Sequence, residues 1–112
     1  MRGLTRLYLR SFPSLARIPG ACPFAWSVLG AIAHATDRIG IATGLTCPIL
    51  RYHPVIVAQA AATVAIMSDN RFTLAVGGRE RLNEHLQGAR WPSVPERHDM
   101  LGESDRYLRL LW

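Results

Sequence analysis

A strand–helix–strand pattern in the middle of the chain, at residues 39–84, most constrains the fold. Residues 39–47 mix β-branched with small residues, and residues 71–76 form a short, nearly continuous apolar run. Between them, Pro54 opens a segment of helical length at 55–67, and proline is favourable in the first turn of a helix. Strands that alternate with helices of this length predict parallel strands joined by right-handed crossovers.

Two further helices are predicted outside this block. Residues 24–36 carry one apolar stripe, made by Val28, Leu29, Ile32 and Ala33. After a polar loop at 77–95, residues 96–112 form a last helix with candidate core positions at Met100, Leu101, Leu108 and Leu111. About two parallel strands with surrounding helices leave both sheet edges unpaired, so the sequence predicts an incomplete α/β unit.

Length and composition limit the class of protein. The 112 residues suit one small domain and fall well short of the roughly 250 residues of a complete (β/α)₈ barrel. Hydrophobic residues make up 49% of the chain, which indicates a globular fold and not a disordered one. The longest apolar runs are shorter than the roughly 18 residues of a membrane span, so we expect no membrane partner.

The positive charge is concentrated at the N-terminus. Residues 1–36 contain four arginines and no acidic residue, whereas residues 37–112 contain nine arginines and eight acidic residues. A basic face woven through the fold is therefore not predicted, and we expect no nucleic-acid partner. Residues 1–22 stand apart as an atypical basic segment. Four interpretations stay open: a non-native or disordered start, a transit peptide, an interfacial helix and an ordinary variable N-terminus.

The cysteines and histidines predict little chemistry. A single pair, Cys22 and Cys47, does not make a disulfide scaffold, and we expect reduced thiols in a cytoplasmic protein. The histidines are His34, His53, His85 and His98, and none has the spacing of a metal site. His53 precedes Pro54 at a helix start, so a capping role is expected.

Polar and glycine residues follow both predicted strands. In parallel α/β folds, ligands bind at the carboxyl ends of the strands. The pattern RYHPVIVAQAAAT followed by an LNE loop, together with PFAWSVLGAIAHATDRIGIATGLTCP and a later W-P pair, resembles the luciferase-like monooxygenase superfamily. The resemblance spans residues 23–112. It is strongest to the coenzyme F420-dependent oxidoreductases related to F420-dependent glucose-6-phosphate dehydrogenase.

The resemblance implies a fold and a cofactor. The fold would be α/β, a partial TIM-like (β/α)₈ barrel, to which this chain supplies the third and fourth strands. The cofactor would be coenzyme F420, with FMN as the alternative, lying across the carboxyl ends of the strands. The intact family would act on a small-molecule substrate, and a homodimer is left open.

The resemblance also assigns roles to individual residues. Glu80 would stand beside the deazaflavin ring as a proton donor, and Asn83 would hydrogen-bond the cofactor. Gly44-Leu45 falls where the family's third strand carries a bulge with a non-prolyl cis peptide bond that presses on the ring. Cys47 occupies the position of a cofactor-contacting threonine.

Departures from the family pattern limit the expected activity. Arg79 stands where the resembling family has a glycine, next to Glu80. The Asp-His pair that ends the family's second strand, including the catalytic base, has no counterpart in residues 1–22. We therefore expect a fragment of a hydride-transferring oxidoreductase that is inactive alone. The alternatives are a non-catalytic module that pairs with another barrel piece and, more weakly, a basic-arm protein that binds membranes or nucleic acid.

Overall fold

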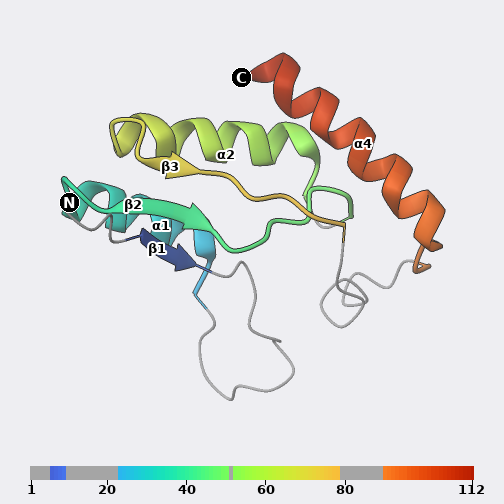
Figure 1. Cartoon of the computed structure of the whole chain (residues 1–112), viewed down its shortest axis with the longest axis horizontal. Coiled ribbons are helices and arrows are strands. Elements are labelled where there is room, and N and C mark those ends of the chain that lie inside the picture. Colours follow the sequence, from blue (N-terminus) through green and yellow to red (C-terminus); the bar gives the residue numbers. More distant parts are fainter. Residues whose placement is uncertain (1–5, 10–22, 51, 79–89) are drawn as a thin grey trace.

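The computed structural model describes residues 6–9, 23–50, 52–78 and 90–112. Parallel strands and helices alternate along the chain, as expected for an α/β fold (Figure 1). The elements are β1 (Arg6–Leu9), α1 (Ala25–Ala35), β2 (Gly40–Thr43), α2 (Pro54–Met67), β3 (Phe72–Thr73) and α4 (Val94–Leu111).

The three strands form one parallel sheet in the order β1-β2-β3. In the register, Gly40 lies opposite Arg6, and Ile41 lies opposite Phe72. The two predicted strands are thus present, and β1 adds a third within the basic N-terminal segment. Its four residues are too short to show a periodic pattern, and its partner in β2 lies more than 30 residues away in the chain.

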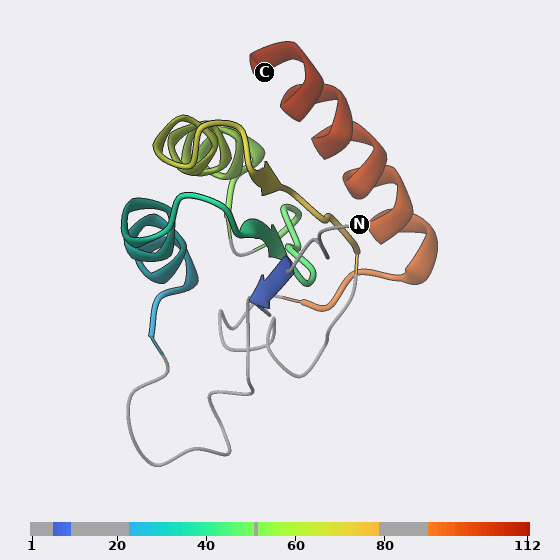
Figure 2. The same ribbon diagram turned by 60° about the vertical axis from the view of Figure 1, so that its left-hand side comes forward.

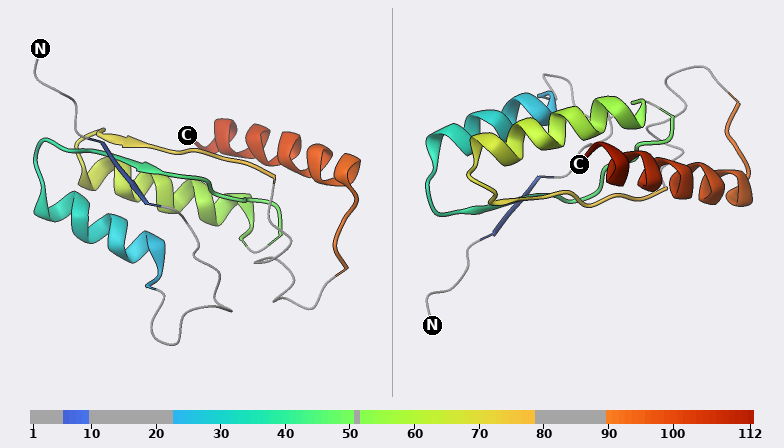
Figure 3. Two further views of the ribbon diagram at one scale, coloured as in Figure 1. Left: turned by 60° about the horizontal axis from the view of Figure 1, so that its bottom comes forward. Right: turned by 90° about the horizontal axis from the view of Figure 1, so that it is seen from above.

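Helices α1 and α2 cover the same face of β2 and β3 (Figure 3). Seen nearly end-on, they lie side by side, and α4 lies beyond α2 (Figure 2). The core between α1, α2 and the sheet consists of Leu29, Ala33, Ile41, Ala61, Val64, Ala65 and Phe72. Of the predicted stripe on α1, Leu29 and Ala33 are buried, which places that stripe against the sheet.

The helix starts follow from local capping. The Nδ1 of His53 accepts a hydrogen bond from the backbone N–H of Val55 at 3.3 Å, so the expected capping role is confirmed. Helix α4 begins two residues earlier than predicted. There, the hydroxyl of Ser93 accepts from the N–H of Glu96, and the N–H of Ser93 donates to the Glu96 carboxylate at 2.6 Å. This backbone hydrogen bond is the main cause of the lowered pKa of Glu96.

Helix α4 packs on α2 through a small second core made of Val57, Ala58 and Leu108. Ser104 is buried, and its hydroxyl donates to the carbonyl of Pro48 at 2.8 Å, which ties α4 to the segment after β2. The prediction that Leu111 belongs to the core is wrong, because its exposed fraction is 54%. Leu110 and Trp112 are exposed as well, so the apolar side chains that follow Leu108 stay outside this core.

Arg71, between α2 and β3, ties together the end of the sheet opposite the expected ligand site. Its guanidinium donates to the carbonyls of Ala33 and Thr36, to the Thr36 hydroxyl, and to the carbonyl of Ile39 at 2.6 Å. Its Nε donates to the carbonyl of Ser68 at 2.7 Å. One side chain therefore joins the last turn of α1, the start of the β2 segment and the end of α2.

Candidate functional site

The candidate site is the edge of the sheet at which β2 and β3 end. The two strands are parallel, so the segments that follow them, residues 44–47 and 74–78, leave the sheet on the same side. The structure brings these segments together through an isolated parallel bridge between Thr46 and Val76. Gly44, Leu45 and Cys47, the three described candidates, therefore lie at one edge.

The pairing between the two segments contains a bulge at Gly44 and Leu45. Ala42 pairs with Thr73, and Thr46 pairs with Val76. Four positions separate the first pair from the second on the β2 side, and three separate them on the β3 side. One extra residue is thus accommodated on the β2 side, which is the definition of a bulge. The bulge expected at this place is confirmed.

Hydrogen bonds hold the bulge on both sides. The hydroxyl of Thr43 accepts from the N–H of Ala75 at 2.8 Å and lies 3.2 Å from the Ala75 carbonyl, to which it donates. Beyond the bulge, the N–H of Thr46 donates to the carbonyl of Ala75 at 2.8 Å, and the N–H of Gly77 donates to the carbonyl of Thr46 at 2.9 Å. Sequence reasoning missed Thr43, because it lies in the middle of the predicted strand at 39–47 and ends the strand only in the structure.

The cis peptide bond expected at Gly44-Leu45 is not present, because the peptide bonds between described residues are all trans. A non-prolyl cis bond costs roughly 3 kcal/mol and persists only where surrounding structure enforces it. In this chain, the bulge forms with trans peptide bonds at Gly44 and Leu45. Gly44 and Leu45 are both exposed at the edge of the sheet.

Leu45 turns back over Gly77. A Cβ atom added to Gly77 would lie 2.5 Å from Cδ1 of Leu45 and 3.1 Å from its Cγ. The absence of a side chain at Gly77 therefore makes room for Leu45. Gly44 and Gly78, like these two residues, add no polar side chain to this edge.

We expect Gly77→Ala to lower the free energy of unfolding by about 1–2 kcal/mol, because Leu45 must leave its place. Leu45→Ala should remove the conflict, so that the double variant shows a coupling energy of about 1 kcal/mol. Gly102→Ala is the matched control: it meets nothing within 4 Å on α4 and should stabilise by about 0.5–1 kcal/mol. Urea unfolding measures all four variants. Additive effects of Gly77→Ala and Leu45→Ala would contradict the contact.

Cys47 carries a reduced thiol and is half-buried next to Thr46, at the expected edge. Glu80, Asn83 and Arg79 lie outside the described residues, so their roles stay predictions. The described residues that flank them are Gly78, which lies against Leu101 and the carbonyl of Arg97, and Arg90.

Sequence reasoning missed Arg97, whose backbone carbonyl lies near Gly78. The guanidinium of Arg97 stacks over the Trp91 ring, with its Cζ atom 4.8 Å from the ring centre. One of its terminal nitrogens donates to the carbonyl of Pro92 at 2.8 Å. Its Nε is buried without a hydrogen-bond partner, the only such side-chain atom in the part of the chain that the structure describes.

Metal chemistry has no support in the described part of the chain, where no cluster of three histidine, cysteine or acidic side chains could hold an ion. None of the described helices is long and apolar enough to span a membrane. What the edge offers is a bulged backbone, glycines, an apolar side chain and a thiol, which are binding and orienting groups.

A family model and several characterised proteins match the sequence of this chain. The family model for luciferase-like monooxygenases matches residues 10–112. An F420-dependent hydroxymycolic acid dehydrogenase of Mycobacterium tuberculosis is 43% identical over 93 residues, which are 83% of this chain and 26% of that protein. An F420-dependent glucose-6-phosphate dehydrogenase of Amycolatopsis mediterranei is 40% identical over 94 residues, or 28% of its length. The chain thus spans about a quarter of the curated relatives it matches.

Solved structures agree in fold. An F420-dependent secondary alcohol dehydrogenase, in complex with an F420-acetone adduct, superposes with a TM-score of 0.82 at 39% identity, covering 96% of this chain and 32% of that one. The monooxygenase RslO1 of Streptomyces bottropensis reaches 0.78 at 22% identity, covering 96% of this chain and 32% of that one, and supports the fold alone. The family model covers most of the residues, and the relatives and the solved structure are about 40% identical: the chain belongs to the luciferase-like monooxygenase family.

Proposed function

We propose that this chain forms one wall of a coenzyme F420 site in an oxidoreductase that transfers a hydride between a small organic substrate and the cofactor. The observation that carries the proposal is the bulge at Gly44 and Leu45, at the edge of the sheet where a parallel α/β fold binds ligands. Support comes from the relatives at 40–43% identity, whose names record F420-dependent dehydrogenases. FMN is the alternative cofactor.

The residues present fit a planar ring. The apolar side chain of Leu45 lies over Gly77, and Gly44 has no side chain. The half-buried Cys47 follows in the same segment. When bound, coenzyme F420 accepts or donates the hydride. The protein's part would be to hold the ring against the bulge, with Asn83 as a hydrogen-bond partner and Glu80 as the acid that supplies a proton.

On its own, the chain should bind but not turn over substrate. No Asp-His pair, the family's catalytic base, occurs in its sequence. Adding the purified chain to F420 should change the cofactor's fluorescence in a saturable way and raise the melting temperature of the chain. When substrate alcohols or sugar phosphates are added, F420 should not become chemically reduced. The same titration with FMN tests the alternative. Unchanged fluorescence with both cofactors would contradict the proposal.

The second candidate is a non-catalytic module that pairs with another barrel piece. The described sheet favours it, since β1 and β3 each have one neighbour and the apolar side chains of Leu110, Leu111 and Trp112 are exposed. Mixing the chain with a polypeptide that carries the remaining strands of a relative's barrel distinguishes the two. Tight pairing without any F420 signal, in the chain or in the pair, would favour the module.

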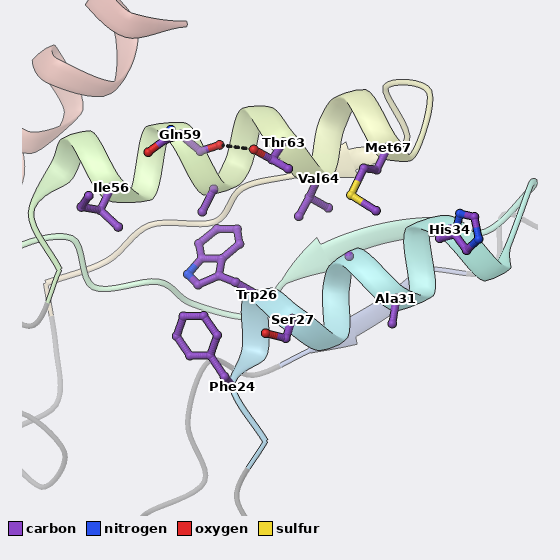
Figure 4. A pocket seen from close by; sticks show the side chains of 12 residues that line it. Phe24, Trp26, Ser27, Ala31, His34, Ile56, Gln59, Thr63, Val64 and Met67 are labelled. Atoms are coloured by element: carbon purple, nitrogen blue, oxygen red, sulfur yellow. Dashed lines mark hydrogen bonds between the residues drawn. The ribbon is translucent and has the colours of Figure 1, made fainter.

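The homodimer that the resemblance leaves open has a candidate face on the outer side of α1 and α2. An open groove of about 640 Å³ lies between these helices (Figure 4). No charged side chain lines it, although the chain has a net charge of +5, so two copies could meet there without repulsion. Its lining residues are Phe24, Trp26, Ser27, Gly30, Ala31, His34, Ile56, Gln59, Ala60, Thr63, Val64 and Met67.

We expect Ile56→Glu to raise the dissociation constant of self-association at least roughly tenfold, since a carboxylate would be buried in an apolar face. Ile66→Glu is the matched control on the same helix, because Ile66 has an exposed fraction of 80% and does not line the groove. Sedimentation equilibrium measures both variants. An unchanged constant for Ile56→Glu, or an equal change for both, would contradict this face.

The remaining expectations concern location and partners. We propose a cytoplasmic protein without nucleic-acid or membrane partners, because the arginines that are not balanced by acids gather in residues 1–36 and the folded part is nearly neutral. Retention on DNA that falls steeply with salt would contradict the absence of a nucleic-acid partner. Fractionation of expressing cells tests the compartment.

A further inference from the structure

We propose that Thr43 is a positioning residue for the cofactor: its hydroxyl sets the register that puts Gly44 and Leu45 into the bulge. The proposal rests on the proposed function, because it gives that bulge its role at the ring face. It adds a residue that does not itself touch the cofactor and acts through the backbone of its neighbours.

The first step is the burial and bonding of the hydroxyl. Thr43 has an exposed fraction of 1%, so its hydroxyl must be satisfied within the protein. Among the described residues, Ala75 satisfies it: the N–H of Ala75 donates to the hydroxyl, and the hydroxyl donates to the carbonyl of Ala75. The Thr43 side chain thus bonds the N–H and the carbonyl of Ala75, the two groups that Ala75 would otherwise use to pair with a neighbouring strand.

The second step is the consequence for register. The Thr43 hydroxyl bonds both backbone groups of Ala75. The N–H of Thr46 donates to the carbonyl of Ala75 as well. Gly44 and Leu45 lie between the paired positions of the ladder, and the next pair is Thr46 and Val76. If the hydroxyl were absent, Gly44 could enter the ladder opposite Ala75. A shift of one residue turns every following side chain to the other face, so Leu45 would leave Gly77.

The third step separates the hydroxyl from the shape of the side chain. Valine has nearly the same shape as threonine and keeps the β-branch that strands favour, but it lacks the hydroxyl. Serine keeps the hydroxyl and loses the methyl group. The pair Thr43→Val and Thr43→Ser therefore tests the hydrogen bonds, and Thr73→Val, at an exposed threonine on β3, is the matched control.

Amide hydrogen exchange of the full chain tests the register. The decisive amides are those of Thr46 and Gly77, because they bond partners other than the Thr43 hydroxyl. We expect Thr43→Val to speed their exchange at least roughly tenfold relative to Thr73→Val, and Thr43→Ser to change it less than about threefold. Unchanged exchange in Thr43→Val would overturn the proposal. Equal acceleration by Val and Ser would also overturn it, since the methyl group would then be responsible.

Fluorescence titration with coenzyme F420 tests the positioning role in the same samples. Thr43→Val should weaken binding at least roughly tenfold, and Thr43→Ser should restore it to within about threefold. Faster exchange with unchanged affinity would overturn the positioning role. If the unmodified chain gives no F420 signal, the proposed function fails, and with it the positioning role, while the exchange data still decide whether Thr43 sets the register.

Discussion

Replacing Arg71 with alanine should lower the free energy of unfolding by about 3 kcal/mol, enough to unfold most molecules of a marginally stable domain. The reason is the number of backbone groups that depend on this side chain. Arg71 donates to carbonyls of Ala33, Thr36, Ile39 and Ser68, and each would lose a charge-assisted partner. Its positive charge also lies at the carboxyl end of α1, where the helix dipole favours a cation.

Arg71→Lys separates charge from geometry. Lysine keeps the positive charge but cannot match the planar fork that reaches three elements at once, so we expect a loss of about 2 kcal/mol. Arg38→Lys is the control, since Arg38 is exposed, and it should change stability by less than about 0.5 kcal/mol. Urea unfolding monitored by circular dichroism measures all three. A loss below about 1 kcal/mol in Arg71→Ala would contradict the clamp.

The sequence predicted what local patterns determine. Helix α2 was expected from residue 55 and begins at Pro54, because proline and the capping His53 act within one turn. The stripe of α1 was correct at Leu29 and Ala33 because helical spacing alone puts them on one face. The start of α4 was missed, although Ser93 and Glu96 have the spacing of a capping box.

Features that depend on distant partners could not be predicted in the same way. Strand β1 is defined by its pairing with β2, and four residues carry too little pattern to indicate that pairing. Arg71 looked like an ordinary arginine at a strand start, since its partners on α1 lie more than 30 residues earlier.

The site shows the same division. The resemblance predicted a bulge at Gly44-Leu45, and the register confirms it. It also predicted a cis peptide bond, which is wrong for this chain, because the peptide bonds between described residues are all trans. The hydrogen bonds between the Thr43 hydroxyl and the backbone of Ala75 could not be predicted, because the two residues lie 32 positions apart in the chain.

The largest expected effect concerns Glu80, in a complete barrel. We propose to graft residues 23–112 in place of the matching segment of the Amycolatopsis mediterranei F420-dependent glucose-6-phosphate dehydrogenase, a relative 40% identical over the aligned residues. The relative then supplies the segment before residue 23, with the Asp-His pair that the resemblance places there. In this chimera, Glu80→Gln should lower kcat on the order of 100-fold, because the amide keeps the shape of the side chain but cannot deliver a proton. Loss of F420 absorbance on addition of glucose 6-phosphate measures the rate.

The control comes from the same loop of the sequence. Glu84 is the other acidic residue between β3 and Arg90, and the resemblance gives it no role. Glu84→Gln should therefore change kcat by less than about twofold. A general acid also gives kcat a pH dependence, and Glu80→Gln should lose the limb that reports this acid while Glu84→Gln keeps it. If Glu80→Gln retains full activity, or if both variants lose it equally, Glu80 is not the proton donor. A fall in kcat with unchanged pH dependence would assign Glu80 to holding the cofactor, and the acid would then have to come from the part of the barrel supplied by the relative.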